Sequence, residues 1–258
     1  MDLKINGQLF IVTGASSGLG NAVARALLSN GARVLAVARR EDMLNALSHD
    51  HPGMVEILAG DLQQEETLQA LMLRLNERLP DGIFVNAGGP PAVSFADAEI
   101  GQWDEAYRLL VRWKVMLVKR LLPLFLQQKY GRILFSESVS IKQPVENLVL
   151  SNSLRMAVAG MAKTLALEVA AKGITVNVIG PGFHDTSAVD RIFARKSELE
   201  GISPEEARKA VVEQIPAGMM GKPEDFASLA AWLLSPLAGF VTGQVITPDG
   251  GANRYSLG

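Results

Sequence analysis

The sequence of 258 residues contains no cysteine, and this absence excludes several kinds of chemistry. Without a thiol the chain forms no disulfide, has no thiolate nucleophile and offers no sulfur ligand to a metal. Histidine is scarce as well, because His49, His51 and His184 are the only three. No carboxylates stand at metal-ligand spacing beside them, so the sequence predicts no metal site.

Strong net charge and long apolar runs are also missing. The formal net charge is -2, which gives no reason to expect a nucleic acid or an anionic membrane as a partner. No uncharged apolar stretch approaches membrane-spanning length, and the first residues lack the apolar run of a signal peptide. A hydrophobic content of 48% with 20% charged residues is typical of a globular protein with a sizeable core. We therefore expect a cytoplasmic protein without membrane or nucleic-acid partners.

Apolar runs that look like buried strands alternate with helical patterns along the chain. The seven runs are residues 9–12, 33–38, 55–59, 82–85, 132–135, 175–179 and 245–247. The segment 103–129 is predicted as one long helix. Parallel strands need crossover connections, so the alternation indicates an α/β fold, a Rossmann-like doubly wound parallel sheet of about seven strands flanked by helices. No linker or repeat divides the chain, and we expect one domain over 1–258.

The turn after the first run is rich in glycine and reads Thr13-Gly14-Ala15-Ser16-Ser17-Gly18-Leu19-Gly20. Gly14 permits a tight turn, Gly18 lets the backbone approach a pyrophosphate, and Gly20 allows the following helix to pack closely on the strand. The N-terminus of that helix favours an anion. An ordinary strand-turn-helix with glycines for packing is the alternative. Three glycines within seven residues favour dinucleotide binding.

Polar or turn-forming residues follow several other strands. Asp61, Asn86, Ser138 and the pair Pro181-Gly182 lie at or just after predicted strand ends. Ligands of open parallel sheets bind beyond the carboxyl ends of the strands. We therefore expect these residues to line one edge of the sheet together with the glycine turn.

These motifs together resemble the short-chain dehydrogenase/reductases of the single-domain type, almost from end to end. The residues that carry the resemblance are the glycine turn, Asp61, Asn86-Ala87-Gly88, Gly131-Arg132-Ile133, Val176-Asn177-Val178-Ile179-Gly180-Pro181-Gly182, Thr186 and Asp249-Gly250-Gly251. Within the family the chain is most similar to 3-oxoacyl-acyl-carrier-protein reductase-like proteins, which share Asn86-Ala87-Gly88-Gly89-Pro90-Pro91 and the pattern at 147–152. The resemblance implies hydride transfer to or from a small carbonyl or hydroxy compound.

The resemblance also implies where a dinucleotide binds. The glycine turn would hold the pyrophosphate and its ribose through Thr13, Gly14, Ser16, Ser17, Gly18, Leu19 and Gly20. Asp61 and Leu62 would read the adenine ring, although Asp61 is also a candidate N-cap of the next helix. The remaining contacts would come from Asn86, Ala87 and Gly88 beside the adenosine ribose, and from Pro181, Gly182 and Thr186 at the nicotinamide carboxamide.

The end of the second strand bears on the type of cofactor. An acidic residue there would accept from the ribose 2′-hydroxyl of NAD. This chain instead has Ala38 followed by Arg39 and Arg40, and arginine matches a phosphate with charge-assisted hydrogen bonds. NADP is therefore favoured, with Arg39 preferred as the phosphate contact and NAD as the alternative. A solvated arginine pair on a surface turn is the competing interpretation.

The catalytic positions depart from the family pattern of asparagine, serine, tyrosine and lysine. The corresponding residues here are Leu110, Ser138, Ser151 and Arg155, and Ser138 and Ser151 stand thirteen positions apart, as is usual in the family. Serine is a much weaker acid than tyrosine, whose reference pKa is about 10, and arginine does not relay protons. Ser138, Ser151 and Arg155 remain the catalytic candidates, Arg155 also as a ligand of the nicotinamide ribose. Proton delivery is thus expected to be non-standard.

Other groups near this edge are weaker candidates for the acid. Tyr107 lies one turn before Leu110, and His184 follows Pro181-Gly182. A half-buried helix aromatic and a surface loop histidine are the simpler interpretations. Glu137, Lys142 and Glu146 lie near the two serines, and we expect such charges to be solvated.

Three functions remain open. The first is an NADP-dependent oxidoreductase acting on a small-molecule substrate, and the second is a catalytically silent dinucleotide-binding sensor or assembly protein. The third is a lyase or epimerase that reuses the pocket. By resemblance, residues 187–220 would form a lid over the substrate, with Ile192, Phe193, Leu199 and Ile215 as apolar residues of amphipathic helices. Residues 239–249 would pair subunits in a homo-oligomer, a dimer or tetramer.

Overall fold

A parallel sheet of seven strands forms the centre of the computed structural model, which describes residues 1–76 and 78–255, apart from the side chains of residues 188, 191, 192, 195, 196, 199 and 200 in one helix. The strands lie in the order β3-β2-β1-β4-β5-β6-β7, and each neighbouring pair is parallel. Their bounds are β1 Leu9–Thr13, β2 Arg33–Ala38, β3 Val55–Ala59, β4 Gly82–Asn86, β5 Gly131–Ser136, β6 Ile174–Ile179 and β7 Val245–Ile246. The predicted α/β fold is confirmed.

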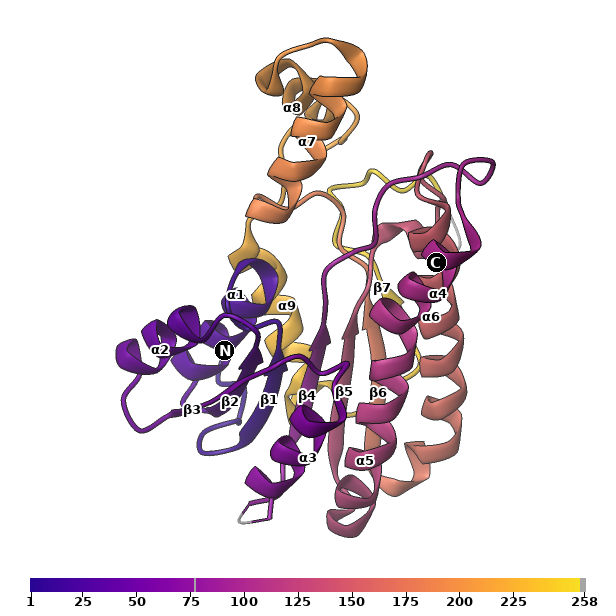
Figure 1. Ribbon diagram of the computed structural model, residues 1–258. Helices are drawn as coiled ribbons and strands as arrows, with labels where there is room; N and C mark the ends of the chain where they lie inside the picture. The colour runs from indigo at the N-terminus through magenta and orange to yellow at the C-terminus, as the bar shows by residue number, and fades with distance from the viewer. Residues whose placement is uncertain (77, 256–258) are drawn as a thin grey trace.

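Helices cover both faces of the sheet (Figure 1). The helices α1 (Gly18–Ser29), α2 (Glu41–Asp50) and α9 (Pro223–Leu234) contribute to one core. The other core includes α3 (Glu65–Arg74), α5 (Trp113–Gln128) and α6 (Val149–Val169). Successive residues of a strand point to opposite faces, and in β4 Ile83 and Val85 join the second core while Phe84 joins the first.

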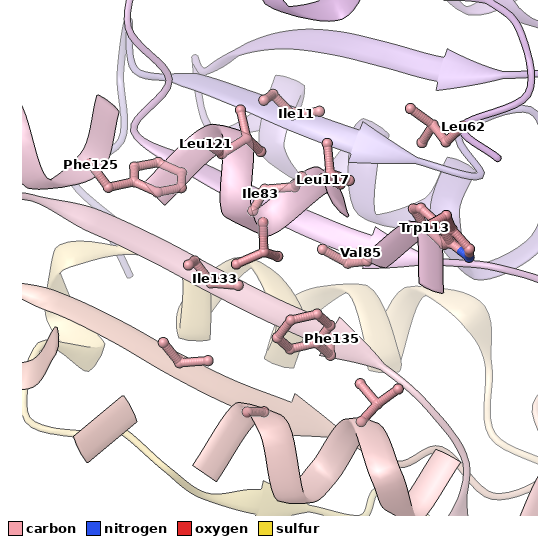
Figure 2. Packing of buried hydrophobic residues seen from close by; sticks show 14 of the residues in the cluster. Ile11, Leu62, Ile83, Val85, Trp113, Leu117, Leu121, Phe125, Ile133 and Phe135 are labelled. Atoms are coloured by element: carbon pink, nitrogen blue, oxygen red, sulfur yellow. The ribbon is translucent and has the colours of Figure 1, made fainter. Parts of the chain in front are cut away.

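The core beside α5 positions the helices that carry the catalytic candidates. Figure 2 shows Ile83 and Val85 of β4 and Ile133 and Phe135 of β5 beneath the side chains of Trp113, Leu117 and Leu121. These side chains are almost fully buried. Burial of large apolar side chains contributes about 1.5–3 kcal/mol each, so α5 is firmly fixed on the sheet.

The predicted long helix over 103–129 is divided. The structure has α4 (Ile100–Tyr107), a π-helical turn at Arg108–Arg112 and then α5. Trp113 Nε1 donates to the carbonyl oxygen of Leu109 inside that turn at 2.7 Å. The periodicity of apolar residues does not reveal this π-helical turn, because the apolar face of the helix continues through it. The prediction of one uninterrupted helix was therefore wrong. π-helical turns inside α-helices often lie at functional sites.

Residues 187–220 form a separate helical projection beyond the sheet edge, with α7 (Ser187–Glu200) and α8 (Pro204–Val212) at the top of Figure 1. Its small apolar core contains Val189, Phe193, Ala207, Val211, Ile215 and Met220. The burial of Phe193 in α7 agrees with a predicted amphipathic helix, whereas Ile215 is buried in the turn after α8. The side chains of Ile192 and Leu199 lie outside those described. In the described part of the chain, no helix combines the length and apolarity that crossing a membrane requires.

Candidate functional site

The glycine turn lies at the carboxyl end of β1, where the sheet order changes direction between β1 and β4. Gly14 and Gly18 have φ angles of 66° and 53°, which disfavour residues with a side chain. A Cβ atom at Gly20 would overlap the carbonyl oxygen of Gly14. The turn therefore has the compact geometry that a pyrophosphate site needs, at the point where open α/β sheets bind ligands.

The adenosine side of the predicted site is assembled around this turn. The hydroxyl of Thr13 donates to the main-chain oxygen of Asn86 at 2.9 Å and accepts from its N–H at 2.7 Å, which joins β1 to β4. Contact of Thr13 with a cofactor stays a prediction. Asp61 Oδ1 accepts from the N–H of Gln63 at 3.0 Å, and Gln64 holds the N-cap position of α3. The N-cap interpretation of Asp61 was therefore wrong.

The opposite side of the turn faces the segment after β6. A Cβ atom at Gly18 would lie 3.6 Å from the side chain of Thr186, so the predicted nicotinamide segment reaches the glycine turn. Gly182 packs against Asp249, and its N–H donates to Pro248 O at 3.1 Å. A Cβ atom at Gly88 would meet no described atom within 4 Å. This combination of close glycines and open space fits a bound dinucleotide.

Of the two arginines after β2, the structure brings Arg40 onto the glycine turn. Arg40 Nη2 donates to Ser17 Oγ at 2.5 Å and to Ser16 Oγ at 3.3 Å. The sequence favoured Arg39; both arginines are exposed, and only Arg40 has hydrogen bonds to the serines of the turn. A guanidinium beside the turn can receive a phosphate, and contact of either arginine with a cofactor phosphate stays a prediction.

The catalytic candidates meet at the ends of β4, β5 and α6. Ser151 and Arg155 lie one turn apart on α6, and Arg155 Nε donates to Ser151 Oγ at 3.0 Å. The same guanidinium donates through Nη1 to the main-chain oxygen of Glu137 at 3.2 Å and through Nη2 to Gly88 O at 3.3 Å. Ser138 follows Glu137, and its hydroxyl oxygen accepts from the N–H of Ser140 at 3.2 Å. Arg155 thus connects Ser151 with Gly88 and with Glu137, the residue before Ser138.

The sequence analysis missed Lys114 and set Glu137 aside as a solvated charge. Glu137 is fully buried, and its Oε1 contacts Lys114 Nζ at 2.5 Å while Oε2 contacts Arg155 Nη1 at 3.1 Å. The expectation that Glu137 is solvated was wrong, because two buried cations surround it. Lys114 has 0% exposure, and burial is the main cause that lowers its pKa. The available signal was a lysine within the inward helical series Leu110, Lys114, Leu117 and Leu121.

The two weaker acid candidates have different environments. Tyr107 is 47% exposed. His184 is buried, its Nδ1 lies 3.1 Å from Gly182 O, and its ring meets Phe226 edge-on. The expectation of a surface loop histidine was therefore wrong, because the ring fills the space beside Gly221 at the base of the projection. Burial lowers its pKa.

The sheet order, the glycine turn and the open edge define a dinucleotide-binding protein of the Rossmann type. Residues 14–253 match the model of a family described as enoyl-(acyl carrier protein) reductase. The chain belongs to the short-chain dehydrogenase/reductase family of oxidoreductases.

Relatives match over nearly their whole length. The chain is 32% identical to dehydrogenase/reductase SDR family member 6 of Rattus norvegicus, covering 96% of this chain and 98% of the relative. It is 28% identical to a 3-oxoacyl-[acyl-carrier-protein] reductase of Rickettsia bellii, with 96% and 98% covered. Among solved structures, L-sorbose reductase from Gluconobacter frateurii, complexed with NADPH and L-sorbose, matches with a TM-score of 0.91 and 27% identity over 99% of this chain and 100% of that one.

Proposed function

We propose that this chain is an NADPH-dependent oxidoreductase that transfers hydride to or from a small carbonyl or hydroxy compound and delivers the proton through Ser151 instead of a tyrosine. The observation that carries this proposal is the hydrogen bond from Arg155 Nε to Ser151 Oγ. In this proposal the hydroxyl of Ser151 and the permanent cation of Arg155 take the roles that tyrosine and lysine have in the family. Both groups lie at the edge that contains the glycine turn.

The preference for NADPH rests on Arg40. Its guanidinium lies against Ser16 and Ser17, so a 2′-phosphate at the adenosine ribose would meet a cation and two hydroxyl groups. The solved relative that contains NADPH supports the same choice. NAD is the alternative cofactor, and it would leave Arg40 without a phosphate partner.

The residues of the chain would handle the charge that forms on the substrate oxygen. The bound cofactor supplies the hydride during reduction. Because Arg155 Nε–H occupies an acceptor position of Ser151 Oγ, the serine proton is free to point at the substrate oxygen. The hydroxyl proton of Ser138 is free in the same way, because its oxygen accepts a hydrogen bond from the N–H of Ser140. The positive charge of Arg155 stabilises the developing alkoxide. The serine hydroxyl and the product alcohol are closely matched in acidity, and the serine oxygen left after proton donation would regain a proton from water.

A catalytically silent dinucleotide-binding protein is the second candidate. Four hydrogen bonds join the Arg155 guanidinium to groups of the protein. A guanidinium has five N–H donors, so one N–H of Arg155 has no hydrogen-bond partner among the described residues. A network this complete is also what a purely structural arginine would make, and only turnover separates the two functions.

The experiment is an assay of NADPH oxidation with a panel of ketones, ketoses and oxoacyl thioesters, beside a fluorescence titration of NADPH. We expect NADPH to bind and at least one carbonyl to be reduced, with a loss of about a hundredfold or more in kcat for Ser151→Ala. Binding without turnover on any substrate would favour the silent protein. The double change Ser151→Tyr with Arg155→Lys is the positive control, because activity in that variant alone would show an otherwise competent pocket.

Further parts of the proposal concern organisation. We infer that 1–258 acts as one domain, that 187–220 covers the substrate, and that the chain forms a dimer or tetramer in the cytoplasm. The exposed Phe240 and Leu167 support an oligomer, since both are large apolar side chains on the surface. Light scattering after size-exclusion chromatography tests the oligomer, and a monomer at working concentration would contradict it.

A further inference from the structure

A buried carboxylate joins three elements directly behind the proton-delivery site. Glu137, at the end of β5, contacts Lys114 of α5 through Oε1 at 2.5 Å and Arg155 of α6 through Oε2 at 3.1 Å. The side chains of Lys114 and Glu137 are fully buried, and that of Arg155 is 8% exposed. Two cations and one anion are thus enclosed together, with Ser151 as the next group in the chain of contacts.

Stability alone is a weak reason for such a cluster. Removing three charged groups from water is costly, and well-packed apolar side chains of similar volume are often at least as stabilising as a buried ion triad. The apolar neighbours Leu110 and Leu117 show that this face of the helix accommodates such side chains. The cluster therefore calls for a role beyond packing.

The contacts of the Arg155 guanidinium indicate that the role is to orient Arg155. Its Nη1 contacts both the main-chain oxygen and Oε2 of Glu137, which fixes the plane of the group at one end. Because a guanidinium is planar and rigid, fixing Nη1 also fixes the direction of the Nε–H bond, which meets Ser151 Oγ. Lys114 Nζ contacts the other oxygen of the carboxylate and so holds the Glu137 side chain in place.

We infer that Glu137 is a positioning residue, which orients Arg155 so that the Ser151 hydroxyl donates to the substrate, and that Lys114 is the counter-charge of Glu137. The role of Ser151 toward a substrate rests on the proposed function. The orientation of Arg155 does not, and it can be measured without turnover.

The first experiment measures exchange of the Arg155 Nε proton with water by ¹⁵N NMR of arginine-labelled protein, the signal being assigned by its loss in Arg155→Lys. We expect slow exchange in the parent and exchange faster by roughly tenfold in Glu137→Gln, the equivalent of one strong hydrogen bond. Glu146→Gln is the matched control, because Glu146 is exposed in the loop before α6. Equal exchange in parent and Glu137→Gln would overturn the inference.

The second experiment uses a carbonyl from the panel. We expect Glu137→Gln to lower kcat by about tenfold to a hundredfold, while KM and the Kd of NADPH stay within about threefold. If the single variant does not fold, Lys114→Met with Glu137→Gln removes the unpaired lysine and leaves Arg155 a neutral hydrogen-bond acceptor at position 137. Stability should return in this double variant while kcat stays low, and recovery of both together would show a merely structural role. If the parent reduces no carbonyl, the proposed function fails, and Nε exchange still decides whether Glu137 orients Arg155.

Discussion

The two halves of the sheet edge are built by different means. On the cofactor half, β1 and its turn depend on backbone conformation, with Gly14 and Gly18 at positive φ and Gly20 packed on Gly14. On the proton half, Lys114, Glu137 and Arg155 depend on contacts between charged side chains of three elements. A backbone-built site tolerates variation of side chains around it, whereas an ion network requires all of its members.

The strongest test of this difference is Lys114→Met. Glu137 would keep only Arg155 as a partner, and we expect the unfolding free energy to fall by about 3 kcal/mol, the lower end for a broken buried ion pair. NADPH affinity should change little, because Lys114 belongs to the proton half. Urea unfolding and an NADPH titration measure the two effects.

The control for this variant is Lys119→Met, the same substitution at an exposed position of the same helix. It should leave stability within about 0.5 kcal/mol of the parent. Equal stability of the two variants would mean that Lys114 is not part of a tightly paired network. Loss of NADPH binding in Lys114→Met would show that the halves are not independent.

The reverse test is Gly20→Ala on the cofactor half. The added methyl would overlap Gly14 O, and overpacking of about 2 kcal/mol should weaken NADPH binding by roughly thirtyfold. Gly101→Ala is the control, because a Cβ atom there meets nothing within 4 Å. Unchanged NADPH affinity in Gly20→Ala would contradict the role of the turn, and faster exchange of Arg155 Nε–H would contradict the separation of the halves.

The difference between a backbone-built cofactor half and a proton half built from side-chain contacts also explains which features could be predicted from the sequence. Each strand could be predicted because it is an apolar run between turn residues, and the glycine turn because backbone demands leave glycine at fixed spacing. The cofactor edge followed from topology, since residues after parallel strands meet at one edge. The assignment of Ser151 and Arg155 required the family resemblance, and their mutual contact required only their spacing of one helical turn.

The ion network could not be predicted in this way. Lys114, Glu137 and Arg155 lie in separate segments, and no local pattern links their charges. A lone glutamate between two serines is most often solvated, and only the packing of α5 and α6 onto β5 encloses it. The π turn before Lys114 was hidden for a similar reason, because the apolar face that predicts a helix continues through it.

A third prediction sharpens the cofactor half by comparing Arg40→Met with Arg39→Met. Arg40 contacts Ser16 and Ser17, so its loss should weaken NADPH binding by about tenfold, as expected for a charge-assisted hydrogen bond. NADH binding should hardly change, since NADH has no 2′-phosphate. A larger loss of NADPH affinity in Arg39→Met than in Arg40→Met would support Arg39 as the phosphate contact, as the sequence suggested. Arg40 would then only stabilise the glycine turn.

The smallest expected effect concerns His184, which is buried against Phe226 at the base of the 187–220 projection. Burial lowers its pKa below the ordinary value of 6.5, so the unfolded chain takes up the proton first as the pH falls. The parent should therefore be fully stabilised above about pH 6.5 and lose stability as the pH falls toward the lowered pKa. In His184→Asn this contribution disappears, and urea unfolding between about pH 8 and pH 5.5 should give a flatter curve than the parent's. Parallel curves for the two proteins would mean that His184 is as readily protonated in the folded chain as in the unfolded one, and that its burial has no electrostatic consequence comparable to that of Lys114.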